Sequence, residues 1–319
     1  MRDHSVLVAG ETLFDLFPTE GEGLESAVYE RRAGGAPANV AVGLARLGRS
    51  PLFWTRVGDD VFGDTLLETL RSHGLPDTLF ERDEDAHTTL AFVDQPSESF
   101  LFYRGADARL SPETTPVTAL DTVEWVALGG VALSASPARA AVTELLHQAS
   151  ERDVPVLFDP NYRPELWEEP PFDVCVRERL NLVDVLKATR AELSTLFPTD
   201  ADLSSQAASA LSRGPHTVCV TEGSAGARLF SSSEAPWEES DTRHPGYDVH
   251  AVDPVGAGDA FNAGLLTALL EGIEEPAKLL GRANAVAAIA TTQRGAMTAL
   301  PRNDEVQIFL DEHESGPLA

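Results

Sequence analysis

Short apolar runs alternate with longer amphipathic stretches along most of this sequence. Ser5–Ala9 is a short apolar run that predicts a buried first strand, and Pro37–Leu47 has the residue spacing of a helix with one apolar face. The same reasoning predicts further strands and helices in turn: Phe62–His73, Trp125–Leu128, Pro137–Ser150, Pro155–Phe158, Val174–Leu180, Val183–Leu186, Leu203–Ser212 and Thr217–Val220. This alternation is typical of a parallel sheet with helices on both faces.

A second, smaller group of strands is expected in the first third of the chain. Thr88–Val93 and Ser99–Tyr103 predict two short strands around the turn residues 94–98. We therefore expect one domain over residues 1–319, with a small β lid formed by about residues 12–33 and 87–106. Leu229–Gly246, rich in Ser, Glu and Pro, predicts an exposed loop or hairpin.

The charge of the chain narrows the choice of partners. The 319 residues include 51 acidic and 24 basic side chains, which gives a formal charge of −27, and the only lysines are Lys187 and Lys278. A dispersed acidic surface of this kind is typical of proteins that stay soluble in high salt, so a halophilic source is expected. Nucleic acid and anionic membranes are poor partners for such a surface. Any phosphate site must therefore act locally.

The cysteines and the N-terminal segment predict a cytoplasmic protein. Cys175 and Cys219 form no CxxC pair, which fits a reducing compartment better than a disulfide framework. The first apolar run is too short for a signal sequence or a membrane-spanning helix.

The stretch Asp253–Phe261 carries the strongest chemical signal. An apolar run ends at Asp253, Gly256 and Gly258 follow, and Asp259 precedes an apolar segment without charge. This order predicts a strand end, a glycine turn and a buried helix, whose first N–H groups lie at the positive pole and can bind phosphate. An acid at this point is either a base for an attacking hydroxyl or an N-cap, and the stretch alone leaves both open.

A second glycine turn, Ala33–Asn39, leads into the helix expected at Pro37. Asn39 is suited to bind a polyol, although ordinary turn chemistry explains the same residues and is the commoner case. Other nucleotide motifs are missing, because neither lysine follows a glycine loop and Phe261 stands where a dinucleotide fingerprint needs glycine. The chain also has no HExxH, GxSxG or clustered Cys/His motif.

Together the two glycine turns resemble the signatures of the PfkB carbohydrate kinase family, also called ribokinase-like. The first signature is matched in spacing by Gly34, Gly35, Asn39, Gly48 and Gly58. Asp253–Asp259 is similar to the second, D-T-x-G-A-G-D, with Pro254 in place of Thr and so one N–H donor fewer. The resemblance runs to about residue 302 and implies a ribokinase-like α/β fold, with a doubly wound, mostly parallel sheet flanked by helices and a small β lid.

The resemblance also implies roles for individual residues, with ATP, Mg²⁺ and a monovalent cation such as K⁺ as cofactors. Asp259 is then the catalytic base, and the anion hole for the transferring phosphoryl group consists of the amides of Gly256, Ala257 and Gly258. The expected nucleotide-binding residues are Lys187, Thr221, Gly223, Gly226 and Asn284. Glu192 matches the N-x-x-E segment linked to Mg²⁺, although Thr189 replaces Asn and a solvated helix acid is the alternative. Asp253 and Gly295 are expected at the monovalent cation.

The substrate is suggested by three segments that resemble fructokinases and 2-keto-3-deoxygluconate kinases: Gly10–Asp15, Phe102–Arg104 and Asp159–Trp167. The expected substrate-binding residues are Asp15, Gly34, Gly35, Asn39, Tyr103, Arg104 and Arg163. Asp15 is suited to two sugar hydroxyls. The two arginines either hold a carboxylate or cross-link the lid. No lysine accompanies the Gly34-Gly35 turn, which disfavours a sugar phosphate.

The expected function is ATP-dependent phosphorylation of a ketohexose, with fructose preferred. The first alternative is a kinase for 2-keto-3-deoxygluconate, and an alternative from another class is a regulator that binds sugar or nucleotide without catalysis. Retention of Asp259 and both glycines speaks against the last. Small-molecule sugar and ATP are the expected partners, together with a homodimer formed through the lid.

Overall fold

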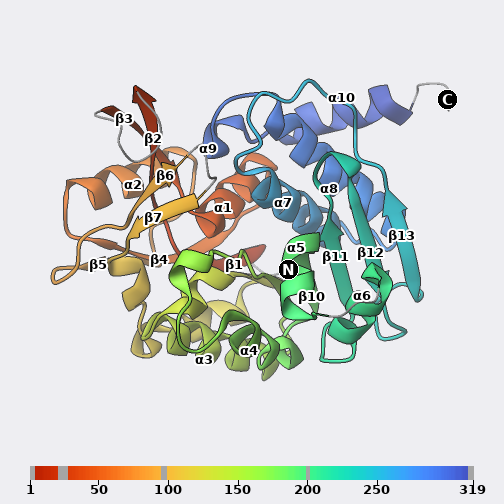
Figure 1. Cartoon of the computed structure of the whole chain (residues 1–319), viewed down its shortest axis with the longest axis horizontal. Coiled ribbons are helices and arrows are strands. Elements are labelled where there is room, and N and C mark those ends of the chain that lie inside the picture. Colours follow the sequence, from red (N-terminus) through yellow and green to blue (C-terminus); the bar gives the residue numbers. More distant parts are fainter. Residues whose placement is uncertain (1–3, 21–27, 95–98, 199–201, 315–319) are drawn as a thin grey trace.

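A large sheet runs through the middle of the molecule (Figure 1). The computed structural model describes residues 4–20, 28–94, 99–198 and 202–314, and within them this sheet has nine strands in the order β13-β12-β11-β10-β9-β8-β1-β4-β5. Their bounds are β1 Val6–Ala9, β4 Leu52–Gly58, β5 Phe80–Asp83, β8 Trp125–Gly129, β9 Val156–Asp159, β10 Val185–Thr189, β11 Thr217–Thr221, β12 Ala227–Ser231 and β13 Ser240–His244. All pairings from β5 to β11 are parallel, and β12 and β13 add antiparallel strands at one edge.

Helices cover both faces of this sheet, as the alternating pattern predicts. Their bounds are α1 Ala36–Arg46, α2 Val61–Ser72, α3 Ala138–Ser150, α4 Phe172–Arg177, α5 Arg190–Leu196, α6 Leu203–Leu211, α7 Ala257–Leu270, α8 Pro276–Thr291, α9 Ala296–Ala299 and α10 Asn303–Glu314. Residues from α1, α2, α7 and α8 form one hydrophobic cluster with one face of the strands, and residues from α3 to α6 form a second cluster with the other. Successive strand residues such as Val6 and Leu7 belong to opposite clusters because side chains alternate across a sheet.

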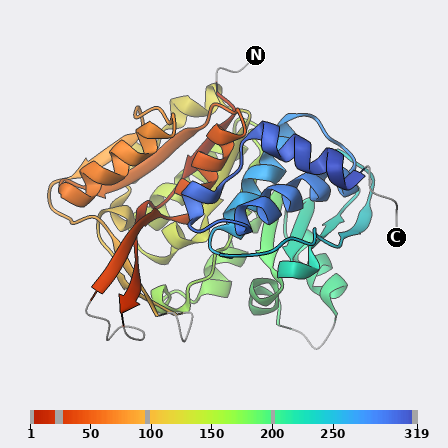
Figure 2. The same ribbon diagram turned by 90° about the horizontal axis from the view of Figure 1, so that it is seen from above.

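A four-stranded lid sheet stands beside the main sheet. It has the order β3-β2-β6-β7, with bounds β2 Leu13–Glu20, β3 Val28–Gly34, β6 Leu90–Asp94 and β7 Ser99–Tyr103. Figure 2 shows the red strands β2 and β3 extending away from the body of the molecule. Strands β6 and β7 lie where Thr88–Val93 and Ser99–Tyr103 predict them, although most of the predicted turn at 94–98 lies outside the described residues.

Several elements differ from the sequence-based prediction. The stretch Leu229–Gly246 does contain a hairpin, but its first part is strand β12, and Leu229 and Phe230 are buried in the core. Strands β4 and β5 and helix α5 were not predicted. Strand β4 is buried on both sides and therefore shows little alternation of apolar and polar residues. Periodicity alone does not distinguish such a strand from a short segment of buried helix.

The parallel strands bring their carboxyl ends to one edge, where open α/β sheets bind ligands. Strands β1, β8, β9, β10 and β11 end there. The starts of α1 and α7 lie at the same edge, and α1 and α7 pack against each other.

Candidate active site

The start of helix α7 is shaped by Gly256. This residue has φ +80°, a left-handed conformation that favours glycine, and a Cβ at this position would lie 2.9 Å from the Cβ of Ala296. Within the described chain no side chain caps α7. The Ala257 N–H donates to the Pro254 carbonyl at 3.2 Å and so closes the turn. Of the three amides in the expected anion hole, Ala257 therefore has a partner within the turn.

Asp259 lies in the first turn of α7 and is held by Asn39 of α1. The Asn39 side chain is buried and donates from Nδ2 to Asp259 Oδ2 at 2.7 Å. Asp259 is partly exposed in a cleft but surrounded by protein atoms. This burial raises the pKa of Asp259 to about 6, and the hydrogen bond from Asn39 opposes the shift. The carboxylate is therefore ionised at neutral pH and close to the pKa that suits a general base.

A narrow cleft of about 130 Å³ lies between the lid sheet and the start of α7. Asp15, Gly35, Asn39, Arg163 and Asp259 line it, together with aromatic side chains of the lid. We call it the sugar cleft. Burial raises the pKa of Asp15 to about 7, while Arg163 lowers it and Asp259 raises it further. Carboxyl groups near their pKa can donate or accept hydrogen bonds, as a polyol requires.

The glycine before helix α1 makes room for this carboxyl group. A Cβ added at Gly34 would lie 2.2 Å from Asp15 Oδ2, so only glycine leaves Asp15 its position. Gly35 has φ +99° and precedes the first residue of α1. The turn therefore aligns Asp15 of β2 with Asn39 of α1 at one cleft.

A wider cleft of about 680 Å³ lies on the other side of the start of α7. Its lining includes all five expected nucleotide-binding residues, Lys187, Thr221, Gly223, Gly226 and Asn284. We call it the nucleotide cleft. Ala257 and Gly258 line this cleft, whereas Gly256 and Asp259 line the sugar cleft. The first turn of α7 is thus the junction of the two clefts.

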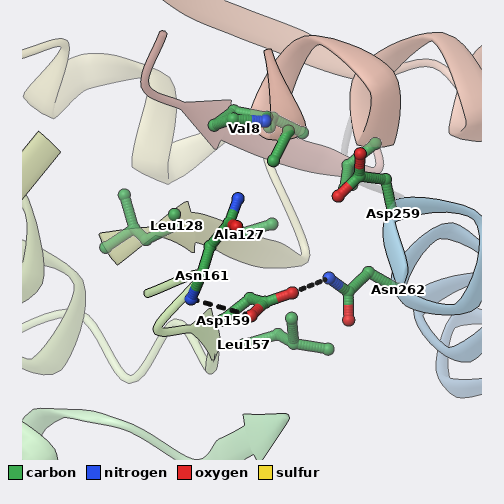
Figure 3. Close-up of a pocket in the computed structure, with 12 residues that line it drawn as sticks. Val8, Ala127, Leu128, Leu157, Asp159, Asn161, Asp259 and Asn262 are labelled. Carbon is green, nitrogen blue, oxygen red and sulfur yellow. Dashed lines mark hydrogen bonds between the residues drawn. The ribbon is translucent and has the colours of Figure 1, made fainter. Parts of the chain in front are cut away.

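A buried polar network beneath this junction was not predicted from the sequence. Asp159, at the end of β9, accepts hydrogen bonds from Lys187 Nζ at 2.8 Å and Asn262 Nδ2 at 2.7 Å. Figure 3 shows Asp159 bonded to Asn262 and to the backbone of Asn161, with Asp259 near them. A Cβ on Gly258 would lie 3.1 Å from Lys187 Nζ, so this ammonium group lies beside the expected anion hole. The only sequence signal was the spacing of Asn262, one helical turn after Asp259.

Three of the expected substrate-binding residues, Gly34, Tyr103 and Arg104, do not line the sugar cleft. Tyr103 is 55% exposed on β7, and its ring contacts Phe92 with a centroid distance of 5.6 Å. Arg104 donates to Asp107 at 2.9 Å, to the Val131 carbonyl at 3.0 Å and to the hydroxyl of Ser134. In this structure Arg104 therefore cross-links the base of the lid.

The residues expected at metal ions are largely engaged by the backbone. Glu192 accepts hydrogen bonds from the Tyr162 N–H at 2.7 Å and from the N–H and hydroxyl of Thr189, as the capping box of α5. Asp253 accepts hydrogen bonds from the Val255 N–H and from the Gly295 N–H, the latter at 3.0 Å. Within the described residues there is no group of three or more His, Cys, Asp or Glu side chains that could hold a metal ion.

One exclusion concerns the helices. In the part of the chain that the structure describes, none is long and apolar enough to cross a membrane.

Comparisons with known proteins match the chain over nearly its whole length. The profile described as pfkB family carbohydrate kinase matches residues 3–303. Fructokinase from Klebsiella pneumoniae is 36% identical over 313 residues, which cover 95% of this chain and 98% of the relative. The resemblance inferred from the two glycine motifs is confirmed.

Two solved structures are similar to this chain in fold, and each of them contains a bound adenine nucleotide. Fructokinase with bound ATP from Xylella fastidiosa has a TM-score of 0.87 at 29% identity, with 98% of this chain and 99% of that one covered. A fructokinase double mutant from Vibrio cholerae O395, in fructose, ADP and potassium ion bound form, has a TM-score of 0.84 at 32% identity. It covers 97% of this chain, and 99% of that chain is matched. The mostly parallel, helix-flanked sheet predicted from the sequence is likewise confirmed.

Proposed function

The chain belongs to the pfkB family of carbohydrate kinases, and on this premise we propose that it transfers the γ-phosphoryl group of ATP to a ketohexose, with fructose preferred. The observation that carries the proposal is the position of Asp259, at the first turn of α7 where the sugar cleft and the nucleotide cleft meet. A base at this junction reaches an acceptor hydroxyl on one side while backbone amides face a phosphate on the other. The Vibrio cholerae relative with fructose and ADP supports the pairing of ligands.

In the proposed reaction Asp259 accepts the proton of the sugar hydroxyl. The resulting oxygen attacks the γ-phosphorus in line, a new P–O bond forms, and the bond to the bridging oxygen of ADP breaks. Asn39 holds the Asp259 carboxylate in position through the 2.7 Å hydrogen bond. The amides at the start of α7 and the Lys187 ammonium group stabilise the charge on the transferring group. Asp259 then releases its proton to solvent.

In the proposed reaction, divalent metal ions act only when bound together with the nucleotide. Mg²⁺ usually keeps several waters and binds through substrate phosphates as well as carboxylates, and it neutralises phosphate charge. Because the oxygens of Glu192 already accept hydrogen bonds from the backbone and Thr189, we assign no step to a metal held by Glu192. The potassium ion of the Vibrio cholerae relative makes Asp253 and Gly295 candidates for a monovalent cation.

A neutral ketose fits the charge of the sugar cleft better than a sugar acid. Asp15 and Asp259 both line this cleft, and each would repel a carboxylate nearby. Arg163 is the observation that favours the alternative substrate, 2-keto-3-deoxygluconate, because it lines the same cleft. However, the Arg163 guanidinium lies 5.3 Å from the centroid of the Phe100 ring, which anchors it to the lid.

The test is ADP production with fructose, 2-keto-3-deoxygluconate and a panel of other sugars. We expect kcat/KM for fructose to exceed that for the acid sugar by at least about tenfold, which corresponds to about 1.4 kcal/mol of differential transition-state binding. Arg163→Met should weaken fructose use modestly and keep the order of preference. A higher kcat/KM for the acid sugar that is abolished in Arg163→Met would establish the alternative. No turnover with any sugar would favour a binding regulator.

We also propose that the lid sheet pairs two copies of the chain. Its edge strands carry large apolar side chains at the surface, with Val28 45%, Leu101 43% and Tyr103 55% exposed. Light scattering after size-exclusion chromatography tests this, because a Leu101→Lys variant should shift a dimer to monomer. A wild-type protein that is monomeric at micromolar concentration would contradict the proposal.

A further inference from the structure

Glu11 is a buried carboxyl group that the mechanism above does not use. It follows β1 by two residues, is only 3% exposed and lines the sugar cleft together with Asp15, Asn39 and Asp259. Its Oε2 atom is buried and has no hydrogen-bond partner among the described residues. A buried polar atom without a partner costs about 1–3 kcal/mol, so its presence in a native site calls for an explanation.

The surroundings of Oε2 show where a partner would lie. A Cβ built on Gly129 would be 3.9 Å from Glu11 Oε2. Gly129 lines a small cavity whose lining includes Asn161 and Asp259, and these two residues also line the sugar cleft. The same Cβ would lie 3.1 Å from Pro37 Cγ. Glu11 and Asp259 line the same cleft, so a ligand held by Asp259 would lie in the cleft that Glu11 also lines.

We propose that Glu11 is a further substrate-binding residue, whose carboxyl O–H donates a hydrogen bond to an oxygen of the ketose. The inference deepens the proposed function and rests on it. It makes a ligand atom the missing hydrogen-bond partner of Glu11 Oε2.

The protonation state of Glu11 is consistent with this role. Burial raises the pKa of Glu11 to about 8; Asp107 and Asp259 raise it further, and Arg104 opposes the shift. At neutral pH the group is thus mostly uncharged and has one O–H donor. A group that donates in the complex has a higher pKa there than in the free protein. Sugar binding is therefore complete below pH 8 and weakens as the pH rises through that value.

The experiment is calorimetric titration of fructose into the nucleotide-free protein between pH 6.5 and 9. We expect the wild-type affinity to fall by up to tenfold per pH unit above pH 8, the limit for loss of one proton. Glu11→Gln keeps an N–H donor and cannot ionise, so it should bind fructose nearly as well at pH 7 and lose the alkaline decline. Glu11→Ala should bind about tenfold more weakly at pH 7, with a higher KM and little change in kcat.

Asp107→Asn is the matched control, because it leaves Glu11 in place and removes a negative charge that acts on it. The alkaline decline should move to lower pH in this variant, which a purely structural role of Glu11 would not produce. An alkaline decline that persists in Glu11→Gln, or fructose affinity in Glu11→Ala equal to that of the wild type, would overturn the inference. If Glu11→Ala does not fold, the Gln variant decides.

The proposed function is tested separately by the wild-type protein alone. If it neither binds nor phosphorylates fructose, the fructose assignment fails, and the same three variants are then titrated with the sugar that the wild type does phosphorylate. An alkaline decline with that sugar that disappears in Glu11→Gln would support the role of Glu11, and its persistence would contradict it.

Discussion

The two clefts that meet at the start of α7 differ in the kind of group that lines them. The sugar cleft has a volume of about 130 Å³ and presents side-chain carboxyl, amide and guanidinium groups from Asp15, Asn39, Arg163 and Asp259. The nucleotide cleft has a volume of about 680 Å³, and its lining includes three glycines and four alanines beside the charged side chains of Lys187, Arg190 and Glu222. We therefore expect the first cleft to depend more on its side chains and the second to depend more on the backbone conformation of its glycines.

This difference predicts two kinds of mutational sensitivity. On the sugar side, an isosteric change of a carboxyl group alters chemistry without moving the backbone. On the nucleotide side, the addition of one carbon to a glycine moves the backbone that forms the cleft. The following predictions test this contrast.

The largest effect is expected for Asp259→Asn. The amide preserves the shape and the neighbour Asn39 but cannot accept the proton, so kcat should fall by about 10²–10⁴. ATP affinity, measured by titration without sugar, should change little because the nucleotide cleft keeps its backbone. Near-normal turnover in this variant would remove Asp259 as the base.

A smaller effect is expected for Gly226→Ala on the nucleotide side. Gly226 has φ +85° and ψ −134°, and a Cβ would lie 2.1 Å from the His244 carbonyl oxygen. The backbone conformation alone should cost about 1–3 kcal/mol of folding free energy, and the clash should raise the KM for ATP more than that for sugar. Gly223→Ala is the matched control, since φ is +61° and no atom lies within 4 Å of its Cβ position. Equal losses in both variants, measured by denaturation and kinetics, would contradict the contrast.

The pH dependence should reveal the Asp259 carboxylate on the sugar side. Its pKa is raised to about 6, chiefly by burial, and the base acts only when ionised. The activity that depends on this base is therefore lost as the pH drops below about 6, where kcat/KM should fall about tenfold per pH unit, whereas the decline expected from Glu11 begins only near pH 8. Because Asp15 and Glu11 interact with Asp259, the profile reports the group as a whole. The acidic decline should be missing from the residual activity of Asp259→Asn, and its persistence there would assign it to another residue.

The smallest effect on either cleft is expected from salt. With a formal charge of −27, repulsion among surface groups should decrease as the screening length falls from about 10 Å at 0.1 M to about 3 Å at 1 M. The melting temperature should therefore rise, whereas fructose affinity should change little because the cleft charges are buried. The melting temperature is measured in KCl and, as a control, in NaCl, so that screening is separated from a specific effect of potassium. A melting temperature that is flat or falling in both salts would contradict a salt-adapted surface.

The sequence predicted local features of the site better than long-range ones. The turns at Gly34 and Gly256 were recognisable because glycine followed by a helix has a direct conformational meaning. The partnership of Lys187 with Asp159 was not, because it joins neighbouring strands 28 positions apart in the chain. Arg104 illustrates the same limit. Its type and spacing allowed either a substrate contact or a cross-link, and only the positions of Asp107 and Val131 distinguish them.

The lid sheet has a consequence for how this protein can evolve. Asp15 lies on β2 and the cleft residues Phe100 and Phe102 lie on β7, whereas the proposed base and anion hole belong to residues 256–259, far away in the chain. Substitutions in the lid can therefore change which sugar is accepted while the groups that move the phosphoryl group stay as they are. Related proteins can in this way share one catalytic segment and differ in substrate specificity, with their sequences diverging mainly in the first hundred or so residues.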